Sequence, residues 1–222
     1  MTDFSCKESN DSPTWGLVNL FVWKLLPERV GGGIAYIQKF KDAWVKHNKE
    51  LIKTSASQNK MPAELLAGVC WIEVGGDPDF IDRVAFEVRS FDWSGPPWVD
   101  RNLTITSNPA KTSFGSVSIQ LRTAAQTMGL NPAEMSSEQI RGLATCLQKD
   151  VFNIEVVANH LRKLIDHDGL QNNPPLLTMD QVRIVGARYN RGIGLSLDEI
   201  NKNTSYGNFI VNFWPRFTKL LR

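Results

Sequence analysis

The chain has 222 residues, of which 42% are hydrophobic and 22% charged, as in an ordinary globular protein with a substantial core. Its 25 Lys and Arg residues barely exceed its 23 Asp and Glu residues, so the formal net charge is +2. Proteins that bind nucleic acid usually carry a concentrated basic stripe, and this weak balance predicts no such partner. The spacing of Cys6, Cys70 and Cys146 predicts no metal site. The apolar surroundings of Cys70 and Cys146 favour buried thiols over a disulfide.

The N-terminal part is predicted to contain a tail, a short apolar helix and a longer helix. Residues 1–13 are polar and lack the basic start and apolar run of a secretory signal. A short helix is expected over 14–27, and its apolar run has about half the length that a bilayer span needs, which predicts no stable membrane insertion. Apolar residues at helical spacing predict a longer helix over 34–55. We expect residues 1–33 to form an N-terminal region and residues 34–222 to form the main domain.

The rest of the chain is predicted to be helical apart from one hairpin. Pro62 opens an apolar helix that stops at Gly75-Gly76. Two short strands around the turn Ser94-Gly95-Pro96-Pro97 predict a small β-hairpin over 84–106. Further helices are expected over 115–128, 137–149, 151–167, 178–189 and 209–221, the last of them broken by Pro215, with Ser136 or Ser137 as the cap of the second. The expected fold class is therefore mainly α, a helical domain with a small β-hairpin insertion.

Glu73 breaks two local preferences of a carboxylate. It directly follows the apolar residues 69–72, whose surroundings raise a carboxyl pKa by desolvation. It also lies near the C-terminus of the predicted helix, where the helix dipole disfavours an anion. Both effects keep the carboxyl protonated closer to neutral pH, which is what a general acid requires. The alternative is an ordinary solvated residue at a helix end.

Four segments match features of one family in the same order. The first is ELLAGVCWIEVGG at 64–76, similar to a helix that ends in a catalytic Glu and a small-residue turn. The second is TSFGSVSIQLRTAA at 112–125, similar to a Ser-x-Gly-x-x-Gln-Ile segment followed by a Thr-Ala helix. The others are DVFNIEVVANHLRKL at 150–164 and ARYNRG at 187–192, similar to a helix beginning with Asn-Ile and to an Ala-Tyr-Asn-x-Gly motif. Over residues 62–195 the chain thus resembles the lysozyme-like superfamily, specifically goose-type lysozymes and soluble lytic transglycosylases.

This resemblance implies cleavage of peptidoglycan glycan strands at the β-1,4 bond between N-acetylmuramic acid and N-acetylglucosamine. Glu73 matches the general acid of the family. Ser113 and Gly115 match a loop that lines the sugar cleft. Tyr189 and Asn190 match a Tyr-Asn pair beside the acid, where the phenol can hydrogen-bond near the carboxyl and hold it in place. No cofactor or metal is implied, because acid catalysis of glycoside cleavage needs none.

The chain also departs from the family pattern in ways that leave the mechanism open. The glutamine of the family motif falls on Ser118, and Gln120 is its candidate replacement. Goose-type lysozymes carry an aspartate shortly before this motif, whereas residues 107–111 contain no acid. Inverting hydrolysis needs a second carboxylate, for which Asp82 and Glu87 are the candidates. Without one, the N-acetyl group of the substrate can attack instead and give the anhydro-sugar product of a transglycosylase.

The resemblance extends to peptidoglycan-degrading toxins that bacteria deliver through type VI secretion systems. Such an effector is made in the cytoplasm without a signal peptide and acts in the periplasm of the target cell. Its partners would be a cognate immunity protein and components of the secretion apparatus. A phage endolysin would look similar. The departures also leave open a catalytically inactive lysozyme-like module that binds glycan or a partner, or a small helical adaptor of a secretion apparatus.

Overall fold

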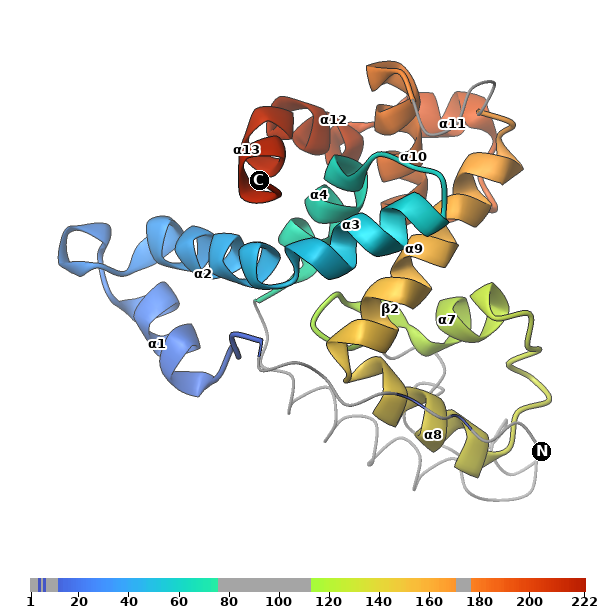
Figure 1. Cartoon of the computed structure of the whole chain (residues 1–222), viewed down its shortest axis with the longest axis horizontal. Coiled ribbons are helices and arrows are strands. Elements are labelled where there is room, and N and C mark those ends of the chain that lie inside the picture. Colours follow the sequence, from blue (N-terminus) through green and yellow to red (C-terminus); the bar gives the residue numbers. More distant parts are fainter. Residues whose placement is uncertain (1–3, 5, 7–11, 76–112, 171–176) are drawn as a thin grey trace. The chain divides into compact units, whose positions relative to one another are not determined.

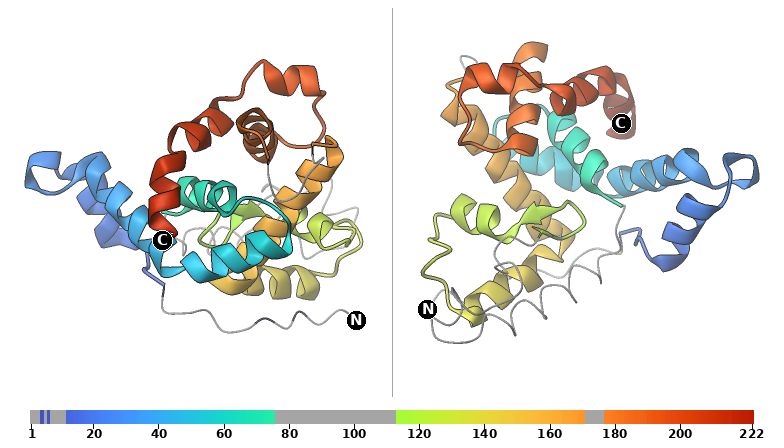
Figure 2. Two further views of the ribbon diagram at one scale, coloured as in Figure 1. Left: turned by 45° about the horizontal axis from the view of Figure 1, so that its top comes forward. Right: turned by 180° about the vertical axis from the view of Figure 1, so that it is seen from behind.

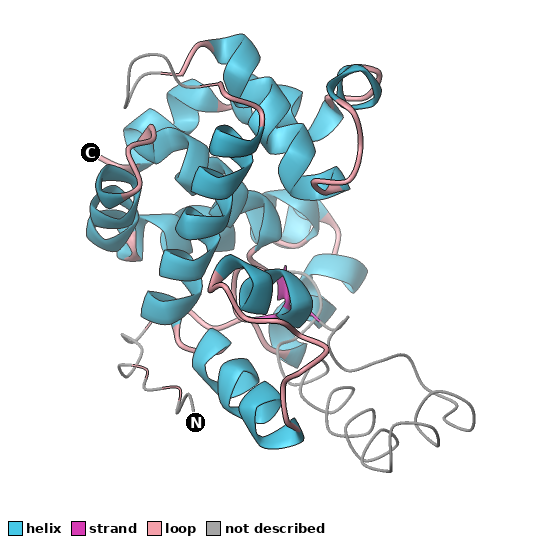
Figure 3. Ribbon diagram, turned by 90° about the vertical axis from the view of Figure 1, so that its right-hand side faces the viewer, coloured by secondary structure: helices cyan, strands magenta, loops and turns pink. Residues whose placement is uncertain are grey.

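The computed structural model describes residues 4, 6, 12–75, 113–170 and 177–222, and this part of the chain is mainly helical, as predicted (Figure 1). The helices are α1 (Leu17–Leu25), the 3-10 helix η1 (Glu28–Val30), α2 (Gly33–His47), α3 (Lys49–Gln58), α4 (Ala63–Glu73), α7 (Leu121–Thr127), α8 (Ser137–Leu147), α9 (Asp150–His167), α10 (Met179–Arg191), α11 (Leu197–Asn201), α12 (Ser205–Asn212) and α13 (Trp214–Leu220). Two short strands, β1 (Ser113–Phe114) and β2 (Ile119–Gln120), complete the list, and Figure 3 shows them among the helices. The β-hairpin predicted over 84–106 lies outside the described residues.

The chain divides into two compact units that interleave along the sequence. Unit 1 consists of Met1–Phe40 and Val74–Asn153, and unit 2 consists of Lys41–Glu73 and Ile154–Arg222. The division falls within α2 and within α9, so each of these helices contributes to both units. Residue 34, where the sequence predicts the start of the main domain, is not a boundary of either unit.

Several helices begin at polar caps that the sequence carries. Ser136 accepts a hydrogen bond from the backbone N–H of Gln139 at the start of α8, and the Gln139 side chain bonds back to Ser136. Thr178 and Gln181 form the same reciprocal pair at the start of α10. Each pair satisfies two backbone groups that a helix start leaves without intrahelical partners. Ser136 is thus the cap of α8, one of the two candidates that the sequence offers.

Two predicted helices are each divided in the structure. The helix predicted over 34–55 is interrupted at Asn48, which separates α2 from α3. The Trp44 carbonyl accepts two hydrogen bonds from Asn48, one from its side chain at 3.2 Å and one from its backbone N–H at 3.1 Å. The helix predicted over 209–221 is broken near Pro215, as expected: α12 ends at Asn212, and Pro215, which lacks a backbone N–H, lies in the first turn of α13.

The helix predicted over 115–128 begins later than expected. Residues 113–120 instead form the antiparallel pair β1–β2, in which Ser113 lies opposite Gln120 and Phe114 opposite Ile119. Helix α7 starts only at Leu121. The predicted helix therefore forms only in the second half of this segment.

Gly115 and Asn153 explain why the first half of this segment is not helical. Gly115 has φ +86°, and a Cβ atom there would lie 2.3 Å from the Leu147 carbonyl oxygen, so the close approach requires glycine. The Asn153 side chain accepts a hydrogen bond from the Val117 backbone N–H at 2.8 Å and donates one to the Val117 carbonyl at 3.1 Å. Both backbone groups of Val117 are thus bound by one side chain rather than by a helix.

The prediction that Cys70 and Cys146 are buried thiols is correct for Cys70 and wrong for Cys146. Cys70 is a buried thiol, as expected. Cys146 is not a thiol: it forms a disulfide with Cys6, and the two Cα atoms are 5.4 Å apart. These residues are 140 positions apart in the sequence, so no local pattern indicates that they meet. The bond joins the N-terminal tail to α8 within unit 1.

The apolar helix α1 is largely uncovered by the described residues. None of its residues is buried, and Leu17, Val18, Phe21 and Leu25 are exposed. The segment is anchored in unit 1 by Trp15, whose ring packs against aromatic side chains that follow it in the sequence. None of the described helices has the combination of length and apolar composition that a membrane span requires.

Close packing of α10 against α12 positions the aromatic residues of unit 2. The two helices lie side by side (Figure 2). A Cβ atom added to Gly207 would lie 2.0 Å from the Arg183 carbonyl oxygen, and one added to Gly186 would lie 2.7 Å from the Gly207 Cα. The absence of side chains at these two sites therefore permits the contact, which fixes the neighbouring Tyr206 relative to α10.

Candidate active site

Glu73 is the last residue of α4, a helix whose body is the core of unit 2. Residues 65–71 are all buried, whereas Glu73 itself is half-buried. Gly75 follows with φ +75°, a conformation that suits glycine and turns the chain just beyond the helix. The carboxyl group thus stands at the negative end of the helix dipole, next to an apolar interior, as the sequence predicts.

Tyr206 holds the carboxyl group of Glu73. It lies on α12, and its hydroxyl donates a hydrogen bond of 2.7 Å to Glu73 Oε1. Tyr189, for which the family resemblance predicts this role, does not make the bond, so that prediction is wrong. The two bonded residues are 133 positions apart, and the segment around Tyr206 carries no motif that singles it out.

The surroundings of Glu73 change its acidity in opposing directions. Burial raises the pKa of Glu73, and this effect outweighs the hydrogen bond from Tyr206 and the positive charge of Lys41, which both lower it. The net result is a pKa above the ordinary value of a glutamate. The carboxyl group therefore keeps its proton to a higher pH than a solvated glutamate does, which suits proton donation near neutral pH.

Tyr189 lies in the same aromatic cluster but does not bond to the acid. Its ring centroid is 5.9 Å from that of Tyr206 and 5.8 Å from that of His160. Its hydroxyl is buried without a hydrogen-bond partner among the described residues. Burial and, secondarily, the negative charge of Glu73 raise the Tyr189 pKa well above its ordinary value, so the phenol stays neutral. Asn190, the other half of the predicted pair, is exposed.

His160 is a further titratable group in the cluster and is half-buried. Burial, followed by the charge of Lys163, lowers the pKa of His160 to about 4. Its imidazole is therefore neutral at physiological pH. The residue contributes a ring contact to Tyr189 and no positive charge under those conditions.

The other predicted site residues belong to unit 1 or lie outside the described residues. Ser113 and Gln120 are paired across β1 and β2, and Gln120 is exposed. Ser118 is half-buried in the turn between the strands, and Gly115 is the glycine held against Asn153. The two candidates for a second carboxylate, Asp82 and Glu87, fall in the segment that the structure does not describe. Within unit 2, the structure therefore brings Glu73 and Tyr189 together and adds Tyr206.

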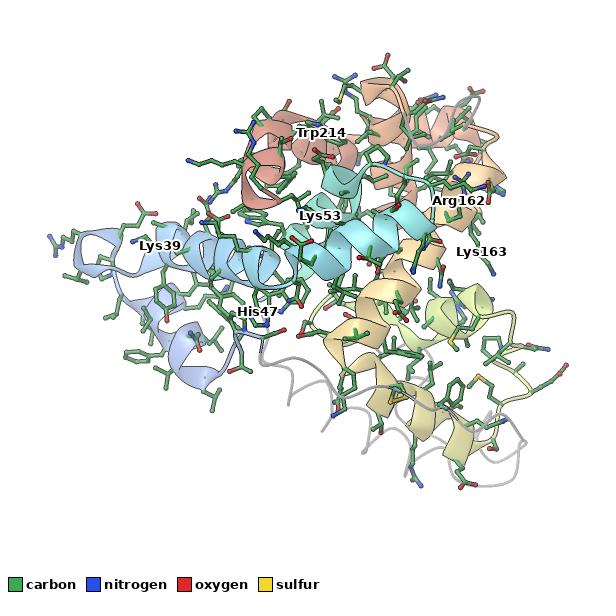
Figure 4. The ribbon with its side chains drawn as sticks, viewed as in Figure 1. Lys39, His47, Lys53, Arg162, Lys163 and Trp214 are labelled. Atoms are coloured by element: carbon green, nitrogen blue, oxygen red, sulfur yellow. A yellow bond between two sulfur atoms is a disulfide. The ribbon has the colours of Figure 1, made fainter. Side chains whose placement is uncertain are left out.

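A cavity of about 870 Å³ lies elsewhere in unit 2. It opens beside the first turn of α4 and is lined by Lys53, Met61, Glu64, Met179 and Trp214, among others; Figure 4 labels Lys53 and Trp214. Glu64 and Glu73 are nine residues apart on one helix, or roughly 13 Å along its axis. This cavity is therefore separate from the Glu73–Tyr206 pair. Within the described ranges, no cluster of three or more His, Cys, Asp or Glu residues could hold a metal ion.

Comparison with known proteins adds no assignment to this geometry. The chain matches no model of a known protein family, no curated protein and no solved structure.

Proposed function

We propose that this chain cleaves the glycan strands of peptidoglycan at the β-1,4 bond between N-acetylmuramic acid and N-acetylglucosamine, with Glu73 as the general acid. The observation that carries the proposal is the environment of the Glu73 carboxyl group. Glu73 is half-buried at the end of an apolar helix, is held by the Tyr206 hydroxyl at 2.7 Å, and has a pKa raised by its burial. Such a group can donate a proton to a departing sugar oxygen near neutral pH.

The chemical step follows from that proton. Glu73 gives it to the oxygen of the glycosidic bond, the bond from that oxygen to the anomeric carbon breaks, and positive charge develops on the sugar ring. The carboxylate left on Glu73 is then stabilised by the Tyr206 hydrogen bond and by the charge of Lys41. Attack by water gives a reducing end, whereas attack within the sugar gives a 1,6-anhydro end. The first route would use Asp82 or Glu87 to activate water.

The alternative is a catalytically inactive lysozyme-like module that binds glycan or a partner. Ser118, which stands where the family motif has glutamine, favours this alternative, because it changes an expected substrate contact. Incubating the protein with purified peptidoglycan separates the two functions. The proposed enzyme releases soluble muropeptides, whereas the binding module sediments with the glycan and releases none.

The disulfide bears on where the protein acts. Disulfides persist in oxidising compartments such as the bacterial periplasm and are rare in the cytosol, so the Cys6–Cys146 bond supports action outside the cytoplasm. We therefore keep the proposal of an antibacterial effector delivered by a type VI secretion system and neutralised by an immunity protein. Directing the protein to the periplasm of a Gram-negative host should lyse the cells, while the same protein kept in the cytoplasm should not.

The Tyr206 hydroxyl should lower the pKa of Glu73, since it donates a hydrogen bond to the carboxylate form. Replacing Tyr206 by Phe should therefore raise the Glu73 pKa above its value in the unmodified protein. The carboxyl carbon of Glu73, followed by NMR across a pH titration, gives that value directly. The control is Tyr36→Phe, which removes a hydroxyl that is hydrogen-bonded to Asn19 instead. This control should leave the Glu73 pKa unchanged. An unaltered or lower Glu73 pKa in Tyr206→Phe would contradict the assigned role.

A further inference from the structure

Lys41 is an unusual lysine because its ammonium group is buried against the end of α4. The residue is 8% exposed, and its Nζ donates hydrogen bonds to the carbonyl oxygens of Trp71 at 2.9 Å and Ile72 at 2.7 Å. These are the two carbonyls immediately before Glu73. The last four carbonyls of a helix lack partners within it. Lys41 of α2 therefore supplies donors to the two carbonyls that directly precede the candidate acid.

Asp42, the next residue on α2, holds the same part of α4 through the side chain of Trp71. Asp42 Oδ1 accepts a hydrogen bond from Trp71 Nε1 at 2.8 Å. Arg216 of α13 binds both oxygens of Asp42, at 2.9 and 2.8 Å, and its guanidinium lies 5.1 Å from the centre of the Trp71 ring. The backbone and indole of Trp71 are thus both held by α2. Lys41 therefore acts on a helix end that is already fixed in place.

The positive charge of Lys41 lowers the pKa of Glu73. Near the carboxyl group, α12 contributes Tyr206 and α10 contributes Tyr189, and burial raises the pKa of both phenols so that they stay neutral. Arg216 from α13 is engaged by Asp42. Among the described residues, Lys41 is the cation whose charge lowers the Glu73 pKa. Burial lowers the pKa of Lys41 to about 8, which still leaves the ammonium mostly charged at neutral pH.

We propose that Lys41 is the positioning residue of Glu73: it ties the last carbonyls of α4 to α2 and keeps a buried positive charge beside the carboxyl group. A catalytic role for Lys41 rests on the proposed function, because Lys41 acts through Glu73 and does not contact the glycan. Burial and the helix dipole favour the protonated carboxyl, and Lys41 opposes them. The acid therefore both holds a proton and releases it to a leaving group.

Two substitutions separate the charge of Lys41 from its hydrogen bonds. Lys41→Gln removes the charge but keeps a donor for the carbonyls, and Lys41→Met removes both. Each should raise the Glu73 pKa by about one pH unit, the lower end of the effect of a neighbouring opposite charge. NMR titration of the Glu73 carboxyl carbon measures the shift. The alkaline limit of glycan cleavage should move to higher pH by the same amount.

The matched control is Lys39→Gln, which removes an exposed positive charge from the same helix; Figure 4 labels Lys39. It should leave the Glu73 pKa unchanged. A second measurement uses the unmodified protein and therefore does not depend on whether a variant folds correctly. Its Glu73 signal should show a second, smaller titration step near pH 8, where Lys41 loses its proton.

An unchanged Glu73 pKa in Lys41→Gln, or the absence of the step near pH 8 in the unmodified protein, would overturn the assignment of Lys41. Both readouts are independent of substrate. If the unmodified protein released no muropeptides, the proposed function would fail while the pKa comparison would still decide the role of Lys41.

Discussion

Glu73→Gln is expected to lower the rate of glycan cleavage by about a hundredfold or more, the usual contribution of a general acid. The amide has nearly the shape of the carboxyl group and can still accept the hydrogen bond from Tyr206, but it has no proton to donate. The loss should therefore be in catalysis and not in folding. The release of soluble muropeptides from purified peptidoglycan measures the rate, and circular dichroism checks the fold.

Glu64→Gln is the matched control for this substitution. Glu64 is in the first turn of the same helix, is also half-buried, and accepts a hydrogen bond from Thr218 at 3.2 Å. Activity of this variant should stay near that of the unmodified protein. Equal rates in Glu73→Gln and the unmodified protein would remove Glu73 from the mechanism.

The pH dependence of cleavage has a predicted direction. A general acid works in its protonated form, so the rate should fall as pH rises through the Glu73 pKa. Because burial raises that pKa, the fall should come at a higher pH than for a solvated glutamate. In Glu73→Gln any residual cleavage should lack this alkaline limb.

Arg188→Leu is expected to destabilise the protein by about 3–5 kcal/mol, because it leaves a buried carboxylate without its partner. Arg188 is 1% exposed, and its Nε and Nη2 atoms each lie 2.8 Å from an oxygen of Asp168, whose side chain is 6% exposed. Arg188 also donates a hydrogen bond to the Leu195 carbonyl. The midpoint of unfolding in urea should move to much lower concentration.

The helix that carries Arg188 also provides the control. Arg183, on α10, pairs with Asp180 at the surface, and both side chains are exposed. Exposed pairs of this kind contribute less than about 1 kcal/mol, so Arg183→Leu should shift the midpoint only slightly. Adding Asp168→Leu to Arg188→Leu should recover part of the lost stability, since the unpaired charge is then removed. Similar midpoints for Arg188→Leu and Arg183→Leu would contradict the importance of the buried pair.

The parts that the sequence predicts correctly are those with local causes. The apolar run before Glu73, the proline at its start and the glycines after it define α4 and place the acid at its end. The cap at Ser136 lies within three residues of the group that it binds, so its pattern is visible in the chain. Propensity, capping and turn preference act over such short spans.

The parts that the sequence does not reveal depend on residues far apart in the chain. Tyr206 reaches Glu73 across 133 positions, and Lys41 meets the carbonyls of Trp71 and Ile72 from another helix. The Cys6–Cys146 disulfide has the same character. Asn153, 36 positions after Val117, bonds to its backbone and replaces the expected helix start with a turn. Only tertiary packing decides such partners, and no spacing rule in one sequence encodes them.

The sugar ends that cleavage creates test the proposed function most directly. Mass spectrometry of purified peptidoglycan digested by the unmodified protein should find fragments that end in N-acetylmuramic acid, either reducing or in the 1,6-anhydro form. The same fragments should be absent after incubation with Glu73→Gln. An intact glycan, cuts only at amide bonds, or the same fragments from both proteins would contradict it.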